Sequence, residues 1–324
     1  MLSLRINLTT RISIFSKAVL VSLFLLASPV FLADYAHGIR LTNVTHLFDI
    51  THGFSQPSDV SVSGNGLIYV LDGVNNKVKV FDQNGRFKFS FGSKGASTGQ
   101  FMFPLGIDVD SSGLVYIADS GNHRVQVFSP EGKYIKHFRV PPEDNTASDP
   151  TDVIADRVNK KLFVVDNDNH YILIFDLETT QMLDTFGGPG AEKTEFRYPF
   201  LMSQNSDHFL YISDVVNTRV QSFTHEGKFV TVVGGWGVDK GRFFRPKGVA
   251  IDKDNRVFIS DSYMGVIQVF RHDGAFHSVI GDPETESVKK FIKPMGMFID
   301  KNNRLYLVEM FANRVSVYQI EDDR

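Results

Sequence analysis

Residues 104–128 read PLGIDVDSSGLVYIADSGNHRVQVF and contain the pattern that decides the fold. Segments 106–110, 114–118 and 124–128 are rich in β-branched and aromatic residues, and the polar sequences DSSG and DSGN separate them, as in strands joined by tight turns. A fourth such segment, 134–138, follows Pro-Glu-Gly. The sequence therefore predicts a unit of four short antiparallel strands, with no intervening helix of the kind that a parallel βαβ arrangement needs.

This unit recurs six times at a spacing of 46 to 49 residues. Repeats 1 to 6 start near Pro57, Pro104, Pro150, Pro199, Pro246 and Pro294. An acid keeps a matching period at Asp72, Asp119, Asp166, Asp214, Asp261 and Glu309. Four-stranded units repeated in this way predict an all-β fold, a six-bladed β-propeller.

The two ends of the repeat array suggest how such a ring closes. Repeat 6 stops after its third strand, at 314–318, and the segment 44–50 ahead of repeat 1 is a candidate for the missing fourth strand. We therefore expect an N-terminal strand to complete the last blade. An open solenoid is the competing architecture, but it would need capping repeats, and the sequence has none.

The composition limits the class of protein. The chain has 324 residues, a formal charge of -3, 42% hydrophobic residues and no cysteine. Such a chain can bury a large core, so global disorder is excluded, and disulfides and thiolate chemistry are absent. The near-neutral charge argues against nucleic acid as a partner.

Residues 1–36 have the layout of a targeting segment. Arg5, Arg11 and Lys17 precede an uncharged apolar run over 18–33, and the first acid is Asp34. This order is typical of a signal peptide, and an N-terminal membrane anchor is the alternative if the segment stays uncleaved. We expect the propeller, residues 42–320, to be secreted, periplasmic or membrane-anchored outside the cytoplasm, touching the membrane only through such an anchor.

The repeated motif resembles the NHL repeat. Its pattern is Pro-x-Gly-(Val/Ile), then Val-Tyr-(Val/Ile)-x-Asp-x-x-Asn-x-Arg-Val-Gln-Val-Phe, and the resemblance extends over residues 42–320. The basic residue five positions after the acid is Arg124, Arg219 or Arg314, with Lys77 in repeat 1, while repeats 3 and 5 have Tyr171 and Val266 there. The family includes a peptide-amidating lyase that binds metal through histidines just after the repeat proline. None of the equivalent positions here is histidine, so the resemblance implies the fold and not that activity.

We interpret the recurring residues as scaffold. Each acid begins a turn in which a carboxylate can accept backbone N–H groups, and the basic residue five positions on can pair with it. Phe54, Phe101, Phe196, Phe243 and Phe291 each stand three residues before the proline, and we expect these rings to pack between blades.

Function is then expected where the repeats differ, at the rim of the central channel. The residues before each proline are Gln56, Phe103, Asp149, Tyr198, Arg245 and Lys293, and those just after it add Asp59, Asp152 and Lys247. This predicted rim is basic in repeats 5 and 6 and acidic in repeats 1 and 3. Such a distribution could orient a zwitterionic or peptide-like ligand, or a charged patch on a protein.

The sequence thus favours an exported, non-catalytic, monomeric scaffold that binds a protein or peptide in the cell envelope on its loop face. No cofactor is implied, although Asp59 and Asp152 could hold a divalent cation in the channel. The alternative is a metal-dependent lyase or hydrolase at the channel mouth that uses Asp59, Asp152 or His52 and resembles the amidating lyase in fold only. Carbohydrate recognition by Tyr198, Phe103 and Trp236 is a third possibility.

Overall fold

The computed structural model describes residues 38–142 and 147–321. The predicted targeting segment, 1–36, lies outside this range. In the described part the chain forms 25 β-strands and two one-turn 3-10 helices, Ser120–Asn122 and Met310–Ala312. No helix of that part has the length and apolar character needed to cross a membrane.

Repeats 1 to 4 each form a separate four-stranded antiparallel sheet. Repeat 1 contains β2 (Asp59–Val62), β3 (Ile68–Asp72), β4 (Lys77–Phe81) and β5 (Phe87–Phe91). Repeat 2 contains β6 (Ile107–Val109), β7 (Val115–Asp119), β8 (Arg124–Phe128) and β9 (Tyr134–Arg139). Repeat 3 contains β10 (Pro150–Asp156), β11 (Lys161–Asp166), β12 (Tyr171–Asp176) and β13 (Met182–Gly187). Repeat 4 contains β14 (Pro199–Gln204), β15 (Leu210–Asp214), β16 (Arg219–Phe223) and β17 (Phe229–Gly234).

Repeats 5 and 6 share one nine-stranded sheet. Repeat 5 contributes β18 (Pro246–Ile251), β19 (Val257–Asp261), β20 (Val266–Phe270), β21 (Phe276–Asp282) and the short β22 (Ser287–Val288). Repeat 6 contributes β23 (Pro294–Ile299), β24 (Arg304–Glu309) and β25 (Arg314–Ile320), and β1 (Leu41–Ile50) completes the sheet.

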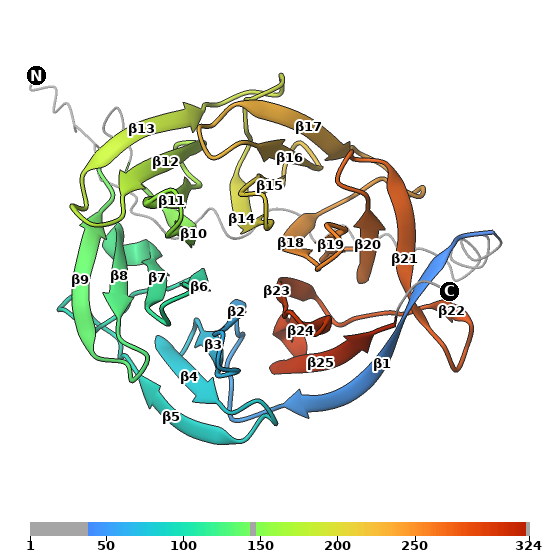
Figure 1. Cartoon of the computed structure of the whole chain (residues 1–324), viewed down its shortest axis with the longest axis horizontal. Helices are drawn as coiled ribbons and strands as arrows, with labels where there is room; N and C mark the ends of the chain where they lie inside the picture. The colour runs from blue at the N-terminus through green and yellow to red at the C-terminus, as the bar shows by residue number, and fades with distance from the viewer. Residues whose placement is uncertain (1–37, 143–146, 322–324) are drawn as a thin grey trace, which may run out of the picture. The chain divides into compact units, whose positions relative to one another are not determined.

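The sheets stand side by side in a ring. The first strand of each repeat lies innermost, and β5, β9, β13, β17 and β21 lie on the perimeter (Figure 1). The middle strands are apolar on both faces because a neighbouring sheet covers each face, and all five residues of β7, for example, are buried. This arrangement confirms an all-β propeller of antiparallel four-stranded sheets.

Strand β1 joins the beginning of the chain to its end. Residues Val44 to Ile50 pair antiparallel with β25, which confirms the predicted contact between these two segments. The strand begins earlier than expected, at Leu41, and its first three residues pair in parallel with Val279 to Gly281 of β21. This second pairing was not predicted, and it merges repeats 5 and 6 into one sheet.

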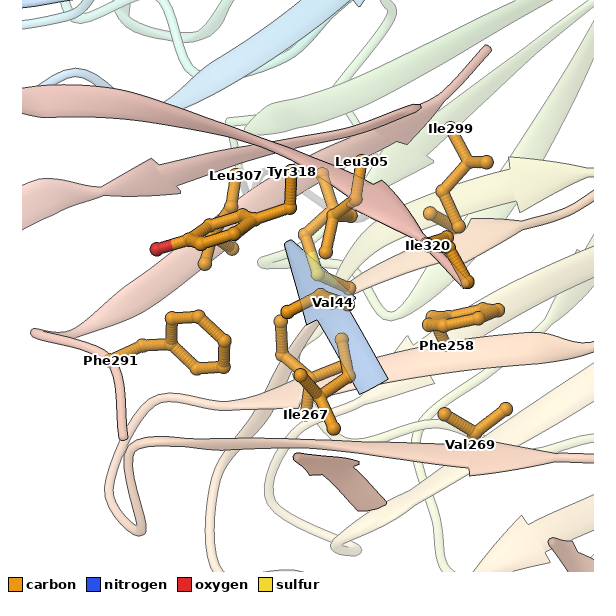
Figure 2. Close-up of a cluster of buried hydrophobic side chains, with 13 residues drawn as sticks. Val44, Phe258, Ile267, Val269, Phe291, Ile299, Leu305, Leu307, Tyr318 and Ile320 are labelled. Carbon is orange, nitrogen blue, oxygen red and sulfur yellow. The ribbon is translucent and has the colours of Figure 1, made fainter. Parts of the chain in front are cut away.

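A hydrophobic cluster holds β1 in this position. Val44, which is 1% exposed, lies among side chains of repeats 5 and 6 (Figure 2). Phe258 and Ile267 pack from one side, and Leu307 and Tyr318 from the other. The apolar contacts of β1 thus attach the N-terminal strand to repeats 5 and 6 at the C-terminal end of the chain.

The recurring phenylalanines and acids are structural. All five rings of the Phe-x-x-Pro pattern are buried, as predicted. Each acid accepts the backbone N–H of the residue 17 positions before it, as Asp119 does from Met102 at 2.8 Å. Asp119 also pairs with Arg124 at 2.8 Å, the ion pair that the motif predicts.

In repeat 1 the predicted cation is wrong. Asp72 pairs at 2.8 Å with Lys79, not with the exposed Lys77. Lys79 stands seven residues after the acid, at the position that Gln126 has in repeat 2. The ammonium group of Lys79 also donates to the backbone oxygens of His52 and Gly53.

Candidate functional site

The turn ahead of each innermost strand forms one end of the ring, and the six residues before the prolines lie there. Gln56, Phe103, Tyr198 and Lys293 have φ values of 47°, 50°, 55° and 53°, a left-handed conformation that is uncommon outside glycine. The preceding repeat holds this conformation: the N–H of Phe103 donates to Asn76 Oδ1 at 2.9 Å. Tyr198 is held in the same way by the ring nitrogen Nδ1 of His170, at 3.1 Å.

Arg245, Lys247 and Lys293 meet at this end as a basic cluster. Burial, together with the positive charges of Arg245 and Lys293, lowers the pKa of Lys247 to about 8. Burial and the charge of Arg245 also lower the pKa of Lys293. The charge of Asp261 acts on the pKa of Lys293 in the opposite direction, but no carboxylate in the described residues forms an ion pair with any of the three, so the cluster is a concentrated positive charge.

Aromatic rings surround the basic cluster. The Nζ atom of Lys247 lies 3.8 Å from the ring centroid of Phe200, and that of Lys293 lies 5.6 Å from the ring centroid of Phe311. Both contacts have the geometry of a cation–π interaction, which keeps the ammonium groups directed towards the aromatic rings.

Other aromatic rings on the same end are open to solvent. We use the term aromatic rim for five side chains that are between 48% and 73% exposed: Phe103, Tyr198, Trp236, Tyr263 and Phe311. Phe244 stacks on Tyr263 at 4.9 Å and lies 6.0 Å from Trp236. Ser262 N–H donates to the carbonyl of Arg245 at 3.0 Å, which puts Tyr263 beside the basic cluster.

Asp149 is the residue before the proline of repeat 3, but it is half-buried and its carboxylate is already hydrogen-bonded. Its carboxylate accepts the hydroxyl of Ser120, and burial raises its pKa, with the charges of Asp168 and Asp166 acting in the same direction. The predicted acidic side of the rim is therefore weaker on this surface than the basic side.

Asp59 and Asp152 do not lie on the exposed rim, where we expected them. They are 7% and 3% exposed and are directed at the neighbouring repeat, because each innermost strand packs closely on the next. Asp59 accepts the N–H of Ile107 at 3.0 Å, and Asp152 accepts that of Met202 at 2.6 Å. Asp108 makes the same kind of contact with Ala155 at 2.9 Å.

These three carboxyl groups have raised pKa values. Burial raises the pKa of Asp59 to about 7 and that of Asp108 to about 6. Burial also raises the pKa of Asp152, and the nearby charge of Asp59 raises it further. No positively charged side chain of the described chain pairs with any of them.

Asp59, Asp108 and Asp152 line a cavity of 310 Å³ between the innermost strands. Apolar side chains of repeats 4 to 6 also line it, namely Leu201, Met202, Val249, Met297 and Phe298, together with polar side chains such as Ser203 and Gln204. At its outer end Arg157 pairs with Asp110 at 2.7 Å, and His208 Nδ1 lies 3.0 Å from Asp156. Arg245, Lys247 and Lys293 are not part of its lining, so the basic cluster and this cavity are separate features.

Two glycines create the room for the carboxylates. A Cβ at Gly106 would lie 2.6 Å from Asp152 Cα, and a Cβ at Gly296 would lie 2.8 Å from Asp59 Cα. Both distances are too short for a side chain, so the Pro-x-Gly pattern of repeats 2 and 6 is needed for the close packing of the innermost strands.

The histidines considered from the sequence lie elsewhere. His52 was expected to face the channel, but its ring stacks on Phe87 of the perimeter strand β5 at 4.2 Å. Among the residues that the structure describes, no group of three or more His, Cys, Asp or Glu side chains could hold a metal ion.

Several residues of these sites were not predicted from the sequence, among them Tyr263 and Phe311 of the aromatic rim, and Asp108, Ser61 and Phe200. A usable signal was present for Asp108 and Ser61, because Asp108 stands two residues after Gly106 and Ser61 two after Asp59. Alternate residues of a strand share a face, so Asp108 lies on the same face as Gly106, and Ser61 on the same face as Asp59. Phe200 carries no such signal, because its role depends on Lys247 of the next repeat.

Repeated antiparallel four-stranded sheets arranged around a central axis define a β-propeller repeat protein. The NHL repeat model matches residues 54–81 and 101–128. The chain is thus a β-propeller in which two of the repeats match the NHL repeat.

One curated relative matches a short stretch. The protein brain tumor of Drosophila melanogaster is 40% identical over 58 residues, which are 18% of this chain and 6% of that protein. The chain therefore matches only a small part of the length of this relative.

Several solved structures share the fold. A streptogramin B lyase has a TM-score of 0.62 at 14% identity, covering 85% of this chain and 97% of its own. Virginiamycin B lyase from Staphylococcus aureus has a TM-score of 0.60 at 13% identity, with coverage of 86% and 94%. Hydrazine synthase from Kuenenia stuttgartiensis has a TM-score of 0.61 at 12% identity, with coverage of 86% and 99%. At these identities the similarity concerns the fold alone.

Proposed function

We propose that this propeller binds an acidic peptide segment of a partner protein on the end that carries the basic cluster and the aromatic rim. The binding is non-catalytic, and the partner's carboxylates lie against Arg245, Lys247 and Lys293. The observation that carries the proposal is the basic cluster itself, which has no carboxylate partner within the described residues.

The aromatic rim supports this choice of ligand. Tyr, Trp, Phe and Arg are enriched in the cores of protein interfaces, and large exposed apolar rings mark interaction surfaces. Trp236 and Tyr263 are 73% and 61% exposed, and both adjoin the basic cluster through Phe244. An NHL propeller is also consistent with protein binding.

We infer that the ring has six blades, with β1 supplying the fourth strand of the last one. The supporting observations are the six repeats and the antiparallel pairing of β1 with β25. Counted in this way, the nine-stranded sheet is two blades bridged by the parallel contact of β1 with β21.

We also propose that the propeller is exported and acts as a monomer in the cell envelope. The support is the basic and then apolar layout of residues 1–36. Fractionation of cells that express the full chain, followed by N-terminal sequencing, tests both export and cleavage.

The binding proposal is tested with a fluorescent acidic peptide, acetyl-(Glu-Glu-Tyr)3-amide, and its Lys-Lys-Tyr counterpart. We expect fluorescence anisotropy to detect binding of the acidic peptide alone. Lys247→Met and Arg245→Glu should each weaken it about tenfold or more, since losing one charge of a desolvated pair costs about 2–5 kcal/mol. Lys88→Glu, an exposed change on the perimeter strand β5, is the matched control.

Equal binding by the wild type, Lys247→Met and Arg245→Glu would exclude the basic cluster as the site. Turnover of a substrate that required added metal and survived these substitutions would instead support the lyase or hydrolase alternative.

A further inference from the structure

The acidic cavity between the innermost strands is independent of the basic cluster and has a distinct chemistry. We propose that it binds a small organic amine, whose ammonium group lies against Asp59, Asp108 and Asp152 and whose apolar body lies against Leu201, Met297 and Phe298. This site goes beyond the proposed binding of an acidic peptide, since it uses other residues and a ligand of opposite charge.

No cationic side chain of the described residues lies against the three buried carboxyl groups of the acidic wall. Asp59, Asp108 and Asp152 come from the consecutive innermost strands β2, β6 and β10, and none forms an ion pair within the described residues. A buried charge without a partner is strongly destabilising. Each carboxylate accepts backbone N–H groups, but every carboxylate oxygen retains a second lone pair for a ligand.

Ser61 provides a second, independent indication of a ligand. Its side chain is 2% exposed, lines the same cavity, and its Oγ atom has no hydrogen-bond partner. Val60 and Val62, its neighbours in β2, pack with the hydrophobic cluster of repeat 6, so Ser61 belongs to the opposite face with Asp59. A buried hydroxyl usually has a partner, and an ammonium donor in the cavity would supply one.

The apolar part of the cavity lining favours an organic amine as the ligand. Leu201, Met202, Val249, Met297 and Phe298 offer no ligand atoms that a hard metal ion prefers, whereas an amine with a hydrocarbon or aromatic body would be covered by them. A ring such as that of Phe298 also attracts an ammonium group. The cavity volume of 310 Å³ suits a ligand of this size.

The other charged groups of the cavity leave the amine position available. Arg157 is engaged with Asp110, and His208 lies against Asp156, both at the outer end. Arg157 is half exposed there, with 39% of its side chain accessible, and Val158 beside it is 75% exposed, so this end opens to solvent. A small amine can enter the cavity by this route.

The test uses the full-length chain and two probes of similar shape, phenethylamine and the uncharged 2-phenylethanol. Isothermal titration calorimetry should give saturable 1:1 binding of the amine and at least about tenfold weaker binding of the alcohol. Asp152→Asn and Asp59→Asn keep an oxygen for the backbone contacts, and each should weaken amine binding by at least about tenfold. Ser61→Ala should weaken it by a smaller factor, without loss of folding.

Asp184→Asn, an exposed change on the perimeter strand β13, should bind the amine as the wild type does. The proposal is overturned if the amine does not bind, if the alcohol binds equally well, or if Asp152→Asn and Asp59→Asn bind like the wild type. Tight stoichiometric binding of Ca²⁺ or Mg²⁺ that excludes the amine would also overturn it. Lys247→Met should leave amine binding unchanged, which keeps this test separate from that of the acidic peptide.

Discussion

Arg314 Nη1 lies 3.1 Å from Asp49 Oδ2 and connects β25 to β1 across 265 residues of sequence. The same guanidinium donates to Glu309 Oε1 at 2.7 Å, the acid of repeat 6. In repeats 2 and 4 the corresponding arginine also pairs with the acid of its own repeat, but its other N–H groups donate to backbone carbonyls of the preceding loop and not to a second carboxylate. The last repeat thus uses the scaffold ion pair to hold the first strand of the ring.

Closure of the ring should depend on the apolar contacts of β1. Val44→Ala removes two buried methyl groups from the cluster between repeats 5 and 6, and we expect the free energy of unfolding to fall by about 2 kcal/mol. Urea denaturation followed by circular dichroism measures the change. Val230→Ala, at a position that is 44% exposed on β17, is the control. An equal, small effect of both substitutions would show that β1 contributes little to stability.

The acids of the turns should matter for folding, and more so where they pair with an arginine. Asp119→Ala leaves Arg124 without its partner in a buried setting, so we expect a loss of about 3–5 kcal/mol. Asp166→Ala is the matched comparison, because repeat 3 has Tyr171 at the arginine position and no cation is left unpaired. Thermal unfolding of both variants should show the larger decrease for Asp119→Ala. The reverse order would contradict the role of the ion pair.

The fold could be read from the sequence because turn residues and β-branched runs repeat with nearly constant spacing. Each strand predicted in 104–138 lies within about two residues of β6, β7, β8 or β9. The parallel contact of Leu41 with Val279 could not be predicted, because pairing between strands so distant in sequence depends on where the ring brings its ends.

The site was harder to predict than the fold. The position relative to the proline places Arg245, Lys247 and Lys293 at the same end of the ring, because equivalent turns precede β18 and β23. The position relative to the proline does not reveal how deeply a side chain is buried, which is why Asp59 and Asp152 were expected on the surface. Their burial depends on the missing side chains of Gly296 and Gly106 in adjacent repeats, a contact between residues far apart in sequence.

The buried carboxyl groups should make the protein more stable in mild acid. With its pKa at about 7, Asp59 binds a proton in the folded state between pH 4 and 7, where the unfolded chain has released it. The free energy of unfolding therefore falls as the pH rises from 4 to 7, by up to about 4 kcal/mol for one such group. Below pH 4 the trend reverses, because hydrogen bonds and charges outweigh burial and lower the pKa of Asp49, Asp110 and Asp156.

The melting temperature between pH 4.5 and 7.5 measures this effect. It should decrease with increasing pH in the wild type, and the slope should be smaller for Asp59→Asn, which carries no titrating group there. Asp184→Asn should retain the slope of the wild type. A flat or opposite profile in the wild type would mean that these carboxyl groups find a cation in the folded protein.

Binding of the acidic peptide should weaken in alkaline solution because Lys247 loses its charge. Its pKa of about 8 lies well below that of an exposed lysine, since burial and the charges of Arg245 and Lys293 disfavour the ammonium form. Between pH 7 and 9.5 we expect the affinity for acetyl-(Glu-Glu-Tyr)3-amide to fall about tenfold as one desolvated charge is lost. Lys247→Arg keeps its charge over this range and should bind with a smaller dependence on pH. Fluorescence anisotropy at constant ionic strength measures both proteins, and identical pH profiles would show that Lys247 does not contact the peptide.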